Sequence, residues 1–265
     1  MKLPLAPVFR FTAALAVSAA AASIPAVAET PAPAATCVAP AELVRLDHPL
    51  RRTAQRVAAG TPLTIVAVGS SSTAGAGASS SAMSYPSRLE VELKSLLPRA
   101  SIKVINRGVG GETVRDMMAR FDSQVIAAKP DVVIWQVGSN SVLRDQPLEP
   151  AGALIRDGLR RLKDSGADVI LMNPQYAPKV IAKNDAELMV DLISLAAKEA
   201  DADLFQRFAV MRYWRLTENI PFETFVSPDE LHMNDWSYAC IGKLVANAIA
   251  DAVRSPAMAK APAKR

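Results

Sequence analysis

The sequence contains two histidines, and one of them follows an aspartate by three positions. Asp229 and His232 lie in the segment SPDELHMND, residues 227–235, immediately before the last long apolar stretch of the chain. Imidazole is the usual general base near neutral pH, and a carboxylate bound to its second nitrogen fixes the tautomer and stabilises the imidazolium. The pair could therefore activate a hydroxyl nucleophile; an ordinary early-turn acid near a helix start is the alternative for Asp229. His48, the other histidine, is expected on the solvated surface.

Serines that could be this nucleophile lie in VGSSSTAGAGASSS, residues 68–81. The composition is typical of a flexible linker, and a Gly/Ser turn is an ordinary way to leave a strand. The segment nevertheless directly follows LTIVAV, residues 63–68, an apolar run typical of a buried strand. Its place after a buried strand favours a functional site over a flexible linker. Residue chemistry alone leaves Ser70, Ser71 and Ser72 nearly equal as candidates.

Two further polar segments follow predicted strands and could stabilise an oxyanion. NRGVGGET begins at Asn106, at the end of the second predicted strand, and GSNS begins at Gly138, at the end of the third. Ester hydrolysis needs donors aimed at the developing oxyanion, and losing one of them typically costs roughly 3 to 4 kcal/mol. A backbone N–H of the glycine segment and the Asn140 amide could be such donors. A tight turn for the glycines and a helix or turn cap for Asn140 are the alternatives.

Strand-like and helix-like runs alternate from residue 61 onward. The predicted strands cover residues 63–68, 102–106, 131–138 and 168–174, with a weaker fifth near Leu204. Four predicted helices cover about residues 85–97, 151–163, 185–200 and 235–253. Another helix is predicted from apolar residues spaced by three and four, namely Val114, Met117, Met118, Phe121 and Val125.

The same spacing predicts which helix faces are buried. The helix over residues 185–200 is expected to have one apolar face formed by Leu188, Met189, Leu192 and Ile193. The last helix is expected to turn six residues inward: Cys240, Ile241, Leu244, Val245, Ala248 and Ile249. This alternation predicts an α/β fold with a parallel sheet covered by helices on both faces. Ligand sites of such sheets form at the carboxyl ends of the strands, where the polar segments described above fall.

Four segments, in this order, resemble the sequence blocks of the SGNH (GDSL-type) hydrolases, a family of serine esterases and lipases. The resemblance covers about residues 61–253 and rests on GSSST, NRGVGGET, GSNS and the D-x-x-H pattern of DELH. It implies a flavodoxin-like three-layer α/β/α sandwich with a mainly parallel five-stranded sheet and no metal or organic cofactor. It also implies a catalytic triad of Ser71, Asp229 and His232, and an oxyanion hole formed by Ser71, Gly111 and Asn140.

The chain departs from the family pattern in its first and third blocks. Ser70 stands where the first block has Asp, Ser72 where it has Leu, and Ser141 where the third block has Asp. Neither Ser70 nor Ser141 replaces an Asp whose proton transfer is expected to be essential, so the resemblance still implies an active enzyme with altered hydrogen bonding in its loops. Other hydrolase classes lack support, because the chain has no G-x-S-x-G motif and no Cys/His/Asp cluster with metal-ligand spacing.

The first 28 residues have the features of a secretory signal peptide. Lys2 and Arg10 bracket the basic start, an Ala-rich apolar run follows, and AVA over residues 26–28 offers small residues for cleavage. The expected organisation is a signal peptide (1–28), an N-terminal leader (29–60), a hydrolase domain (61–254) and a disordered basic tail (255–265). This predicts a periplasmic or secreted protein with no stable membrane insertion after cleavage; an uncleaved membrane anchor is the alternative.

Positive charge is concentrated at the two ends of the chain. The formal net charge is +4, but Lys2 and Arg10 would leave with the signal peptide. The last eleven residues, SPAMAKAPAKR, carry three cations and no acid, so the folded body has a formal charge near −1. The basic ends therefore do not indicate a nucleic-acid-binding face.

Two cysteines remain after the expected cleavage, Cys37 in the leader and Cys240 on the last predicted helix. In an oxidising compartment an isolated pair favours one disulfide, which would tie the leader to the body. Two unpaired thiols are the alternative, because two cysteines give no framework pattern to test.

The segments after the third and fourth strands, SVLRDQPLEP and NPQYAPKVIAKND, are polar and of moderate length. No long apolar insertion could form a lid or an acyl tunnel, which favours short, acetyl-like esters of an envelope or extracellular carbohydrate. Four residues could line the pocket, with surface or loop roles as the alternative for each: Arg107, Arg144, Gln175 and Tyr176. The other functions left open are a lysophospholipase or thioesterase acting on longer chains, an acyltransferase, and a non-catalytic glycan-binding relative.

Overall fold

The computed structural model of this protein describes residues 35–254. The expected signal peptide (1–28) and basic tail (255–265) lie outside the described residues. Five parallel strands form one sheet in the order β2-β1-β3-β4-β5. They are β1 (Leu63–Gly69), β2 (Ile102–Gly108), β3 (Val132–Gln136), β4 (Asp168–Met172) and β5 (Asp203–Phe205). This strand order is that of flavodoxin-like folds, so the predicted fold class is confirmed.

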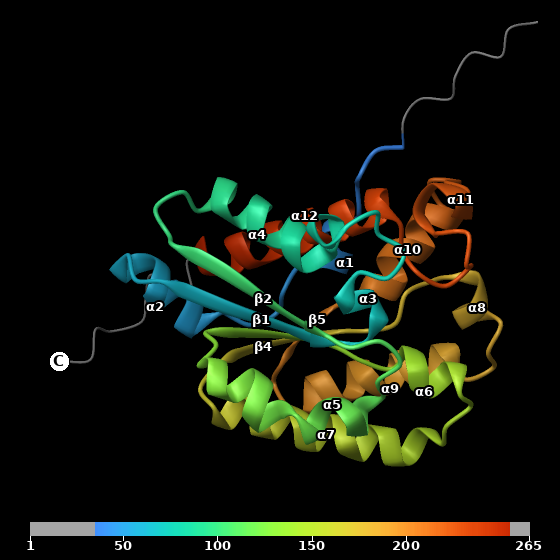
Figure 1. The fold of residues 1–265 in the computed structure, drawn as a ribbon, viewed down its shortest axis with the longest axis horizontal. Helices are drawn as coiled ribbons and strands as arrows, with labels where there is room; N and C mark the ends of the chain where they lie inside the picture. The colour runs from blue at the N-terminus through green and yellow to red at the C-terminus, as the bar shows by residue number, and fades with distance from the viewer. Residues whose placement is uncertain (1–34, 255–265) are drawn as a thin grey trace, which may run out of the picture. The chain divides into compact units, whose positions relative to one another are not determined.

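Helices cover both faces of the sheet, as Figure 1 shows. One face is covered by α4 (Tyr85–Leu96), α10 (Arg207–Leu216) and α12 (Asp235–Arg254), and the other by α5 (Val114–Ala119), α7 (Leu148–Asp164) and α9 (Ala186–Glu199). Successive side chains of a strand point to opposite faces. Ile65 and Ala67 of β1 therefore join the first core, whereas Val66 and Val68 join the second. The three inner strands, β1, β3 and β4, are mostly apolar and buried because neither of their faces meets water.

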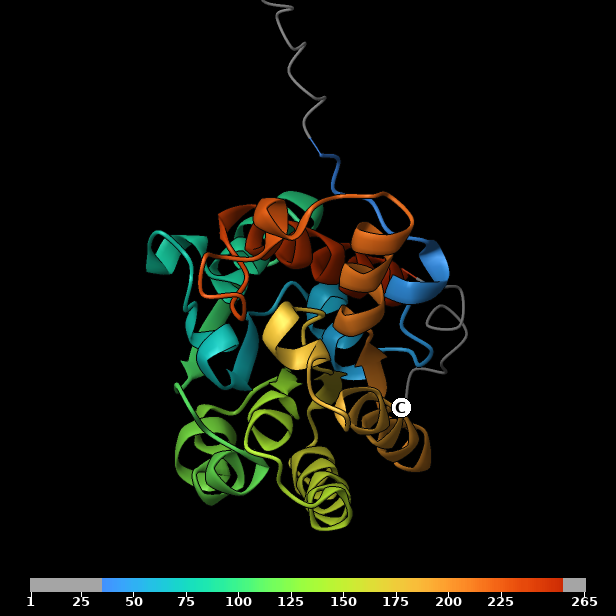
Figure 2. The ribbon, with the colours of Figure 1, turned by 90° about the vertical axis from the view of Figure 1, so that its right-hand side faces the viewer.

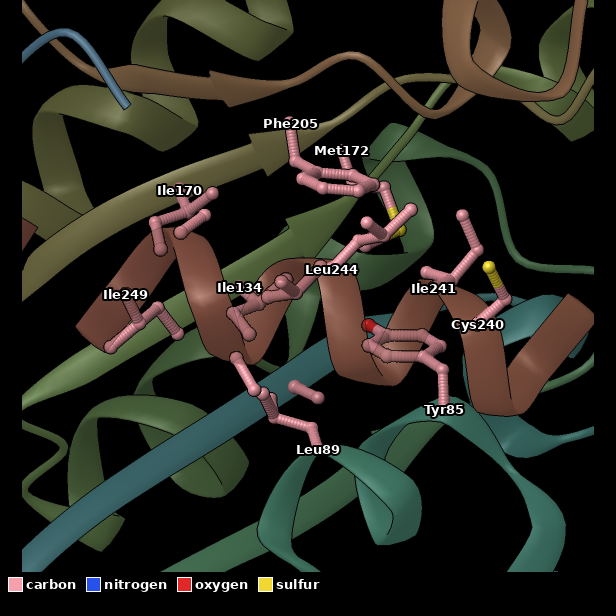
Figure 3. Close-up of a cluster of buried hydrophobic side chains, with 14 of the residues drawn as sticks. Tyr85, Leu89, Ile134, Ile170, Met172, Phe205, Cys240, Ile241, Leu244 and Ile249 are labelled. Carbon is pink, nitrogen blue, oxygen red and sulfur yellow. The ribbon is translucent and has the colours of Figure 1, made fainter. Parts of the chain in front are cut away.

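Helix α12 packs on the sheet through the face that the sequence predicts (Figure 3). Ile241 and Ile249 are fully buried, and they lie in one apolar cluster with Ile134 of β3 and Ile170 of β4. Helix α4 packs closely on α12 and adds Leu89 to this cluster. All six residues expected to point inward from α12 are buried. No helix of residues 35–254 combines the length and apolar character needed to span a membrane.

Two helix predictions need correction. The helix expected through Val125 is not continuous: α5 ends at Ala119, and a π-helical turn, η2 (Phe121–Val125), and a 3-10 turn, η3 (Ile126–Ala128), follow. The break coincides with Arg120, whose buried guanidinium binds Glu112 of the glycine loop rather than solvent. On α9, Leu188 is 55% exposed, so its predicted place on the buried face is wrong. Ala196 and Ala197 instead pack inward beside Met189 and Ile193.

Residues 35–60, for which the sequence predicts no helix, contain α1 (Ala41–Val44) and α2 (Arg51–Ala59). The start of α2 has no local cap, because Leu50 occupies the N-cap position. Asp168 of β4 replaces the cap: its Oδ2 accepts from the Thr53 N–H at 2.8 Å and from the Thr53 hydroxyl at 2.7 Å. A carboxylate so distant in sequence cannot be recognised as a cap from local pattern.

The two cysteines form a disulfide, Cys37–Cys240, with Cα atoms 5.4 Å apart. The bond joins the N-terminal segment to α12. Two indoles hold the same segment, since Trp214 Nε1 donates to the Val38 carbonyl and Trp236 Nε1 to the Ala35 carbonyl. His48 keeps 40% of its side chain exposed, and its backbone N–H donates to Asp203.

Candidate functional site

The carboxyl ends of the strands, which face the viewer in Figure 2, gather the polar segments that follow them. At the end of β1 the chain turns into the short helix α3 (Ser71–Ala74). Burial separates the three candidate serines: Ser70 and Ser72 are 2% and 1% exposed, whereas Ser71 is only partly buried. Ser71 opens α3, so its N–H has no partner within the helix. Of the three hydroxyls, the one at Ser71 is best placed to meet a substrate.

Ser71 lies in hydrogen-bond contact with the histidine segment. His232 Nε2 is 2.8 Å from Ser71 Oγ, and His232 Nδ1 is 2.5 Å from Asp229 Oδ2. The other carboxylate oxygen, Asp229 Oδ1, accepts from the backbone N–H groups of Leu231 and His232, each at 2.9 Å, and from the Ser227 hydroxyl at 2.8 Å. The structure thus brings Ser71, His232 and Asp229 into one chain of contacts.

These contacts keep Asp229 ionised. Burial acts to raise the pKa of Asp229, but the hydrogen bonds from His232, Leu231 and Ser227 outweigh it and hold the pKa well below its ordinary value. An ionised carboxylate only accepts hydrogen bonds. In a neutral imidazole the proton must therefore lie on the neighbouring nitrogen, His232 Nδ1, and Nε2 is the nitrogen that can accept one from Ser71.

The glycine segment after β2 is fastened beside Ser71. Val109 N donates to the Gly69 carbonyl at 3.0 Å, and Asn106 Nδ2 donates to the Thr73 carbonyl at 2.8 Å. Only glycine fits at position 108, because a Cβ there would lie 2.0 Å from the Ala74 backbone nitrogen. A Cβ at Gly110 would lie 4.0 Å from Ser71 Cβ, so this loop forms one wall of the space around the serine.

Asn140 binds this loop at the residue after Gly111. Asn140 lies on α6 (Ser139–Leu143), directly after β3, and its Nδ2 donates to the Glu112 carbonyl at 2.8 Å. That bond uses one of the two amide N–H groups and leaves the second for a ligand. From the other side of the loop, Arg144 donates to the Gly111 carbonyl at 2.7 Å.

Ser70 stands in a neutral buried network where the family pattern has an acid. Its N–H and hydroxyl both donate to Gln136 Oε1 at 3.0 Å, and the Thr73 hydroxyl donates to the same oxygen at 3.3 Å. Gln136 has no exposed surface and was not among the residues singled out from the sequence. The available signal was a polar residue inside the apolar run VVIWQV.

A second buried amide, Gln175, connects the histidine segment to the rest of the site. Gln175 is 1% exposed, so the structure corrects the expectation that it lines a pocket. Its Oε1 accepts from the Ser139 hydroxyl at 2.9 Å and from Arg207 at 3.0 Å, while its Nε2 donates to the Leu231 carbonyl at 3.1 Å. Gln175 therefore links the residue before Asn140 to the residue before His232.

Arg207, which fixes the orientation of this amide, is fully buried on neutral partners. Its Nε donates to the Asn173 carbonyl at 3.0 Å, and its second contact is Gln175. Burial lowers the pKa of Arg207 to about 10, against the opposing effect of Tyr85 and Tyr238. A guanidinium has no acceptor. The amide oxygen of Gln175 must therefore face Arg207, and its nitrogen must face Leu231.

The other three residues considered for the pocket have different surroundings. Arg107 donates to the Gln124 carbonyl, and Tyr176 packs edge-on against Phe208 with ring centres 5.1 Å apart. Of the three, Arg144, which binds the Gly111 carbonyl, borders a cavity of about 370 Å³. Its lining is mixed: Thr113, Arg115, Asp116, Ser141 and Gln146 are polar, and Val114, Pro147, Pro150, Ala151 and Leu154 are apolar. Within residues 35–254, no three His, Cys, Asp or Glu side chains are grouped so as to hold a metal ion.

Comparison with known proteins places this chain among esterase-like sequences. A model of the non-GDSL lipase-like family matches residues 36–255. An acetylxylan esterase from Geobacillus stearothermophilus is 37% identical over 94 residues, 32% of this chain and 43% of that protein. An arylesterase from Vibrio mimicus is 27% identical over 130 residues, 47% of this chain and 64% of that protein. The matches thus span less than two thirds of the length of these curated relatives.

Solved structures share the fold at low identity. A two-domain esterase active on acetylated mannans, crystallised with mannopentaose, has a TM-score of 0.69 and is 20% identical, over 80% of this chain and 56% of that one. The acetylxylan esterase of Geobacillus stearothermophilus has a TM-score of 0.61 and is 21% identical, over 71% of this chain and 94% of that one.

Proposed function

Because this chain belongs to the non-GDSL lipase-like family, we propose that it is an exported serine esterase of the SGNH type that removes short, acetyl-like acyl groups from a carbohydrate. The observation that carries the proposal is the 2.8 Å contact between Ser71 Oγ and His232 Nε2, with Asp229 on the other ring nitrogen. The family name agrees with the first block of the chain, in which Ser70 and Ser72 replace the Asp and Leu of the GDSL pattern.

The proposed reaction passes through an acyl-enzyme. Ser71 Oγ attacks the ester carbonyl carbon while its proton passes to His232 Nε2, and Asp229 stabilises the imidazolium that forms. His232 then gives the proton to the alcohol oxygen, the carbon–oxygen bond breaks and the alcohol leaves. A water molecule repeats the sequence on the acyl-enzyme, which releases the carboxylic acid and restores Ser71.

We assign the stabilisation of the oxyanion in this mechanism to three donors. They are the Ser71 N–H in the first turn of α3, the Gly111 N–H and the second amide N–H of Asn140. The loop that carries Gly111 is braced by the ion pair of Glu112 with buried Arg120, whose Nε lies 2.9 Å from both carboxylate oxygens. A fixed loop supports catalysis because preorganised donors need no rearrangement as the charge develops.

The preference for short acyl groups on a sugar is supported by the relatives and by the surroundings of the site. An acetylxylan esterase and an esterase active on acetylated mannans are among the proteins that this chain resembles. Solved catalytic mutants of the acetylxylan esterase replace a serine, an aspartate and a histidine. The segments that follow β3 and β4, residues 141–150 and 173–185, contain no long apolar insertion that could form an acyl tunnel. The disulfide Cys37–Cys240 supports export, since disulfides persist in oxidising compartments.

A fluorophosphonate probe and a series of aryl esters test the proposal. We expect the probe to label the folded protein once, at Ser71, as seen by intact mass and peptide mapping. We also expect kcat/KM to be highest for acetyl or propionyl esters and to fall as the acyl chain lengthens. An unlabelled Ser71 would favour the non-catalytic glycan-binding alternative, and activity that rises beyond eight carbons would favour the lysophospholipase or thioesterase alternative.

Replacing Gln175 by glutamate is expected to lower activity without lowering thermal stability. The substitution keeps an acceptor for Ser139 and gives buried Arg207 a counter-charge, but it removes the donor to the Leu231 carbonyl. We expect kcat to fall about 10-fold with KM little changed, because one hydrogen bond contributes roughly 1 kcal/mol. The midpoint of thermal unfolding should stay the same or rise.

Gln206→Glu is the matched control for this variant. Gln206 precedes Arg207 in the chain, is partly exposed and stands at the N-cap position of α10, where a negative charge is favourable. The same chemical change there should leave kcat as it is in the wild type. Equal activity of the Gln175→Glu variant and the wild type would show that the histidine segment does not depend on this amide.

A further inference from the structure

We propose that a groove beside the His232 segment binds the sugar ring of the alcohol that leaves, with Trp236 as the platform under the ring. The groove has a volume of about 510 Å³ and is lined by residues 77–79, Ser227, Pro228 and residues 234–236. The inference rests on the esterase function proposed above and adds to it the place where the carbohydrate lies.

The walls of the groove are the segments that hold His232. A Cβ at Gly77 would lie 2.9 Å from His232 Cβ and 2.4 Å from the Met233 carbonyl oxygen, so residues 77–79 press directly on the histidine segment. Ser227 N donates to the His232 carbonyl at 2.8 Å, and the Ser227 hydroxyl donates to Asp229. The groove therefore borders the segment that carries His232, whereas the 370 Å³ cavity is lined by Arg144 and residues 113–116.

The proposed reaction places the leaving alcohol of the substrate near the histidine segment. The general acid must reach the oxygen of the leaving alcohol, so that alcohol has to sit beside His232 Nε2. An acetylated sugar is then oriented with its acyl carbon at Ser71 and its ring on the histidine side. The groove lies against the segment that carries His232, and Gly77 in its wall is close to His232 Cβ.

Trp236 is a rigid aromatic surface within the groove. The indole is only partly buried, packs edge-on against Trp214 with ring centres 5.0 Å apart, and donates through Nε1 to the Ala35 carbonyl at 3.2 Å. A ring fixed on one side and open on another loses little conformational freedom when a ligand covers it. Large amphipathic rings of this kind supply contact area together with defined geometry.

Asp235 and Ser79 supply the polar contacts that a sugar requires. Asp235 Oδ1 accepts from the Ser79 N–H at 2.8 Å, and Oδ2 accepts from the Ser79 hydroxyl at 2.5 Å. These bonds use two of the roughly four acceptor sites of the carboxylate. The remaining sites can accept from sugar hydroxyls. An alkyl chain laid against Asp235 would strip water from a charged group without replacing its hydrogen bonds, whereas a sugar can bond to the carboxylate and place its apolar ring face on Trp236.

Two variants test the groove against an acetylated xylo-oligosaccharide and 4-nitrophenyl acetate. Trp236→Ala should lower the ratio of kcat/KM for the oligosaccharide to that for the aryl ester by about 10-fold, mainly through KM. Asp235→Asn keeps the shape and an oxygen for the Ser79 N–H, and should lower the same ratio about fivefold. Tyr213→Ala is the control: this partly exposed aromatic residue on α10 bonds to Glu218 away from the groove, and its loss should leave the ratio as in the wild type.

The outcomes separate this inference from the proposed function. A wild-type protein that hydrolyses neither ester would contradict the esterase proposal alone. The groove would then be judged by binding of unacetylated xylo- and manno-oligosaccharides in ligand-observed NMR, which should be saturable and weaker in Trp236→Ala. Wild-type binding that is absent or matched by Trp236→Ala overturns the groove. If both esters are hydrolysed but Trp236→Ala and Asp235→Asn leave their ratio unchanged, the groove is also overturned.

Discussion

Replacing Ser71 by alanine is expected to lower kcat/KM for 4-nitrophenyl acetate by about 10⁴-fold or more, with the protein still folded. Ser71 is partly exposed at the start of α3, and its hydroxyl is 2.8 Å from His232 Nε2. Without this oxygen no acyl-enzyme forms, and loss of a nucleophile removes most of the acceleration while any oxyanion stabilisation and binding remain. Thermal unfolding should change little, because no other described hydrogen bond uses the Ser71 hydroxyl.

Ser70→Ala and Ser72→Ala are the controls for this prediction. Both side chains are buried, and the Ser70 N–H would still donate to Gln136 after its hydroxyl is removed. Losing one neutral hydrogen bond costs about 1 kcal/mol, so each control should keep at least roughly a tenth of the wild-type kcat/KM. Equal losses in all three variants would show that Ser71 is not the nucleophile.

The fold could be predicted because local sequence patterns mark the strands of this chain. LTIVAV and DVVIWQV are short apolar runs between helical periodicities, and a sheet covered on both faces accounts for them. The positions of Ser71 and Asn140 followed from the same rule, since both come directly after a strand. The choice of Ser71 among three serines required the family resemblance. In the structure, burial separates Ser71 from its two neighbours.

Features that depend on distant partners could not be predicted in this way. The start of α2 is capped by Asp168, 115 residues away in sequence, and Gln175 joins two loops that no local pattern relates. Arg120 interrupts a helix whose apolar spacing continues unchanged through Val125. In each case a tertiary hydrogen bond decides the local structure. Periodicity reports which side is buried and says little about where a helix must stop.

Removing the disulfide is expected to lower the free energy of unfolding by about 3 to 5 kcal/mol. Cys37 and Cys240 are separated by 203 positions, so the bond closes most of the described chain into one loop. The loss of chain entropy in the unfolded state corresponds to about 5 kcal/mol for a loop of this length, and measured values are commonly smaller. For a protein of this size, the unfolding midpoint should fall by roughly 10 °C.

Thermal unfolding of the Cys37→Ser variant and of the reduced wild type tests this effect. The variant places its new hydroxyl at the less buried of the two cysteine positions. Cys37 is only partly buried, whereas Cys240 is 3% exposed and can remain as a small apolar thiol. Both samples should unfold at the same lower temperature. Two titratable thiols in the denatured, unreduced protein would contradict the disulfide itself.

The same N-terminal segment also holds the indole of Trp236. Trp236 donates to the Ala35 carbonyl and Trp214 to the Val38 carbonyl, so releasing the segment should loosen the indole of Trp236. A loss of stability accompanied by a weaker preference for acetylated oligosaccharides would therefore connect the disulfide to the sugar groove.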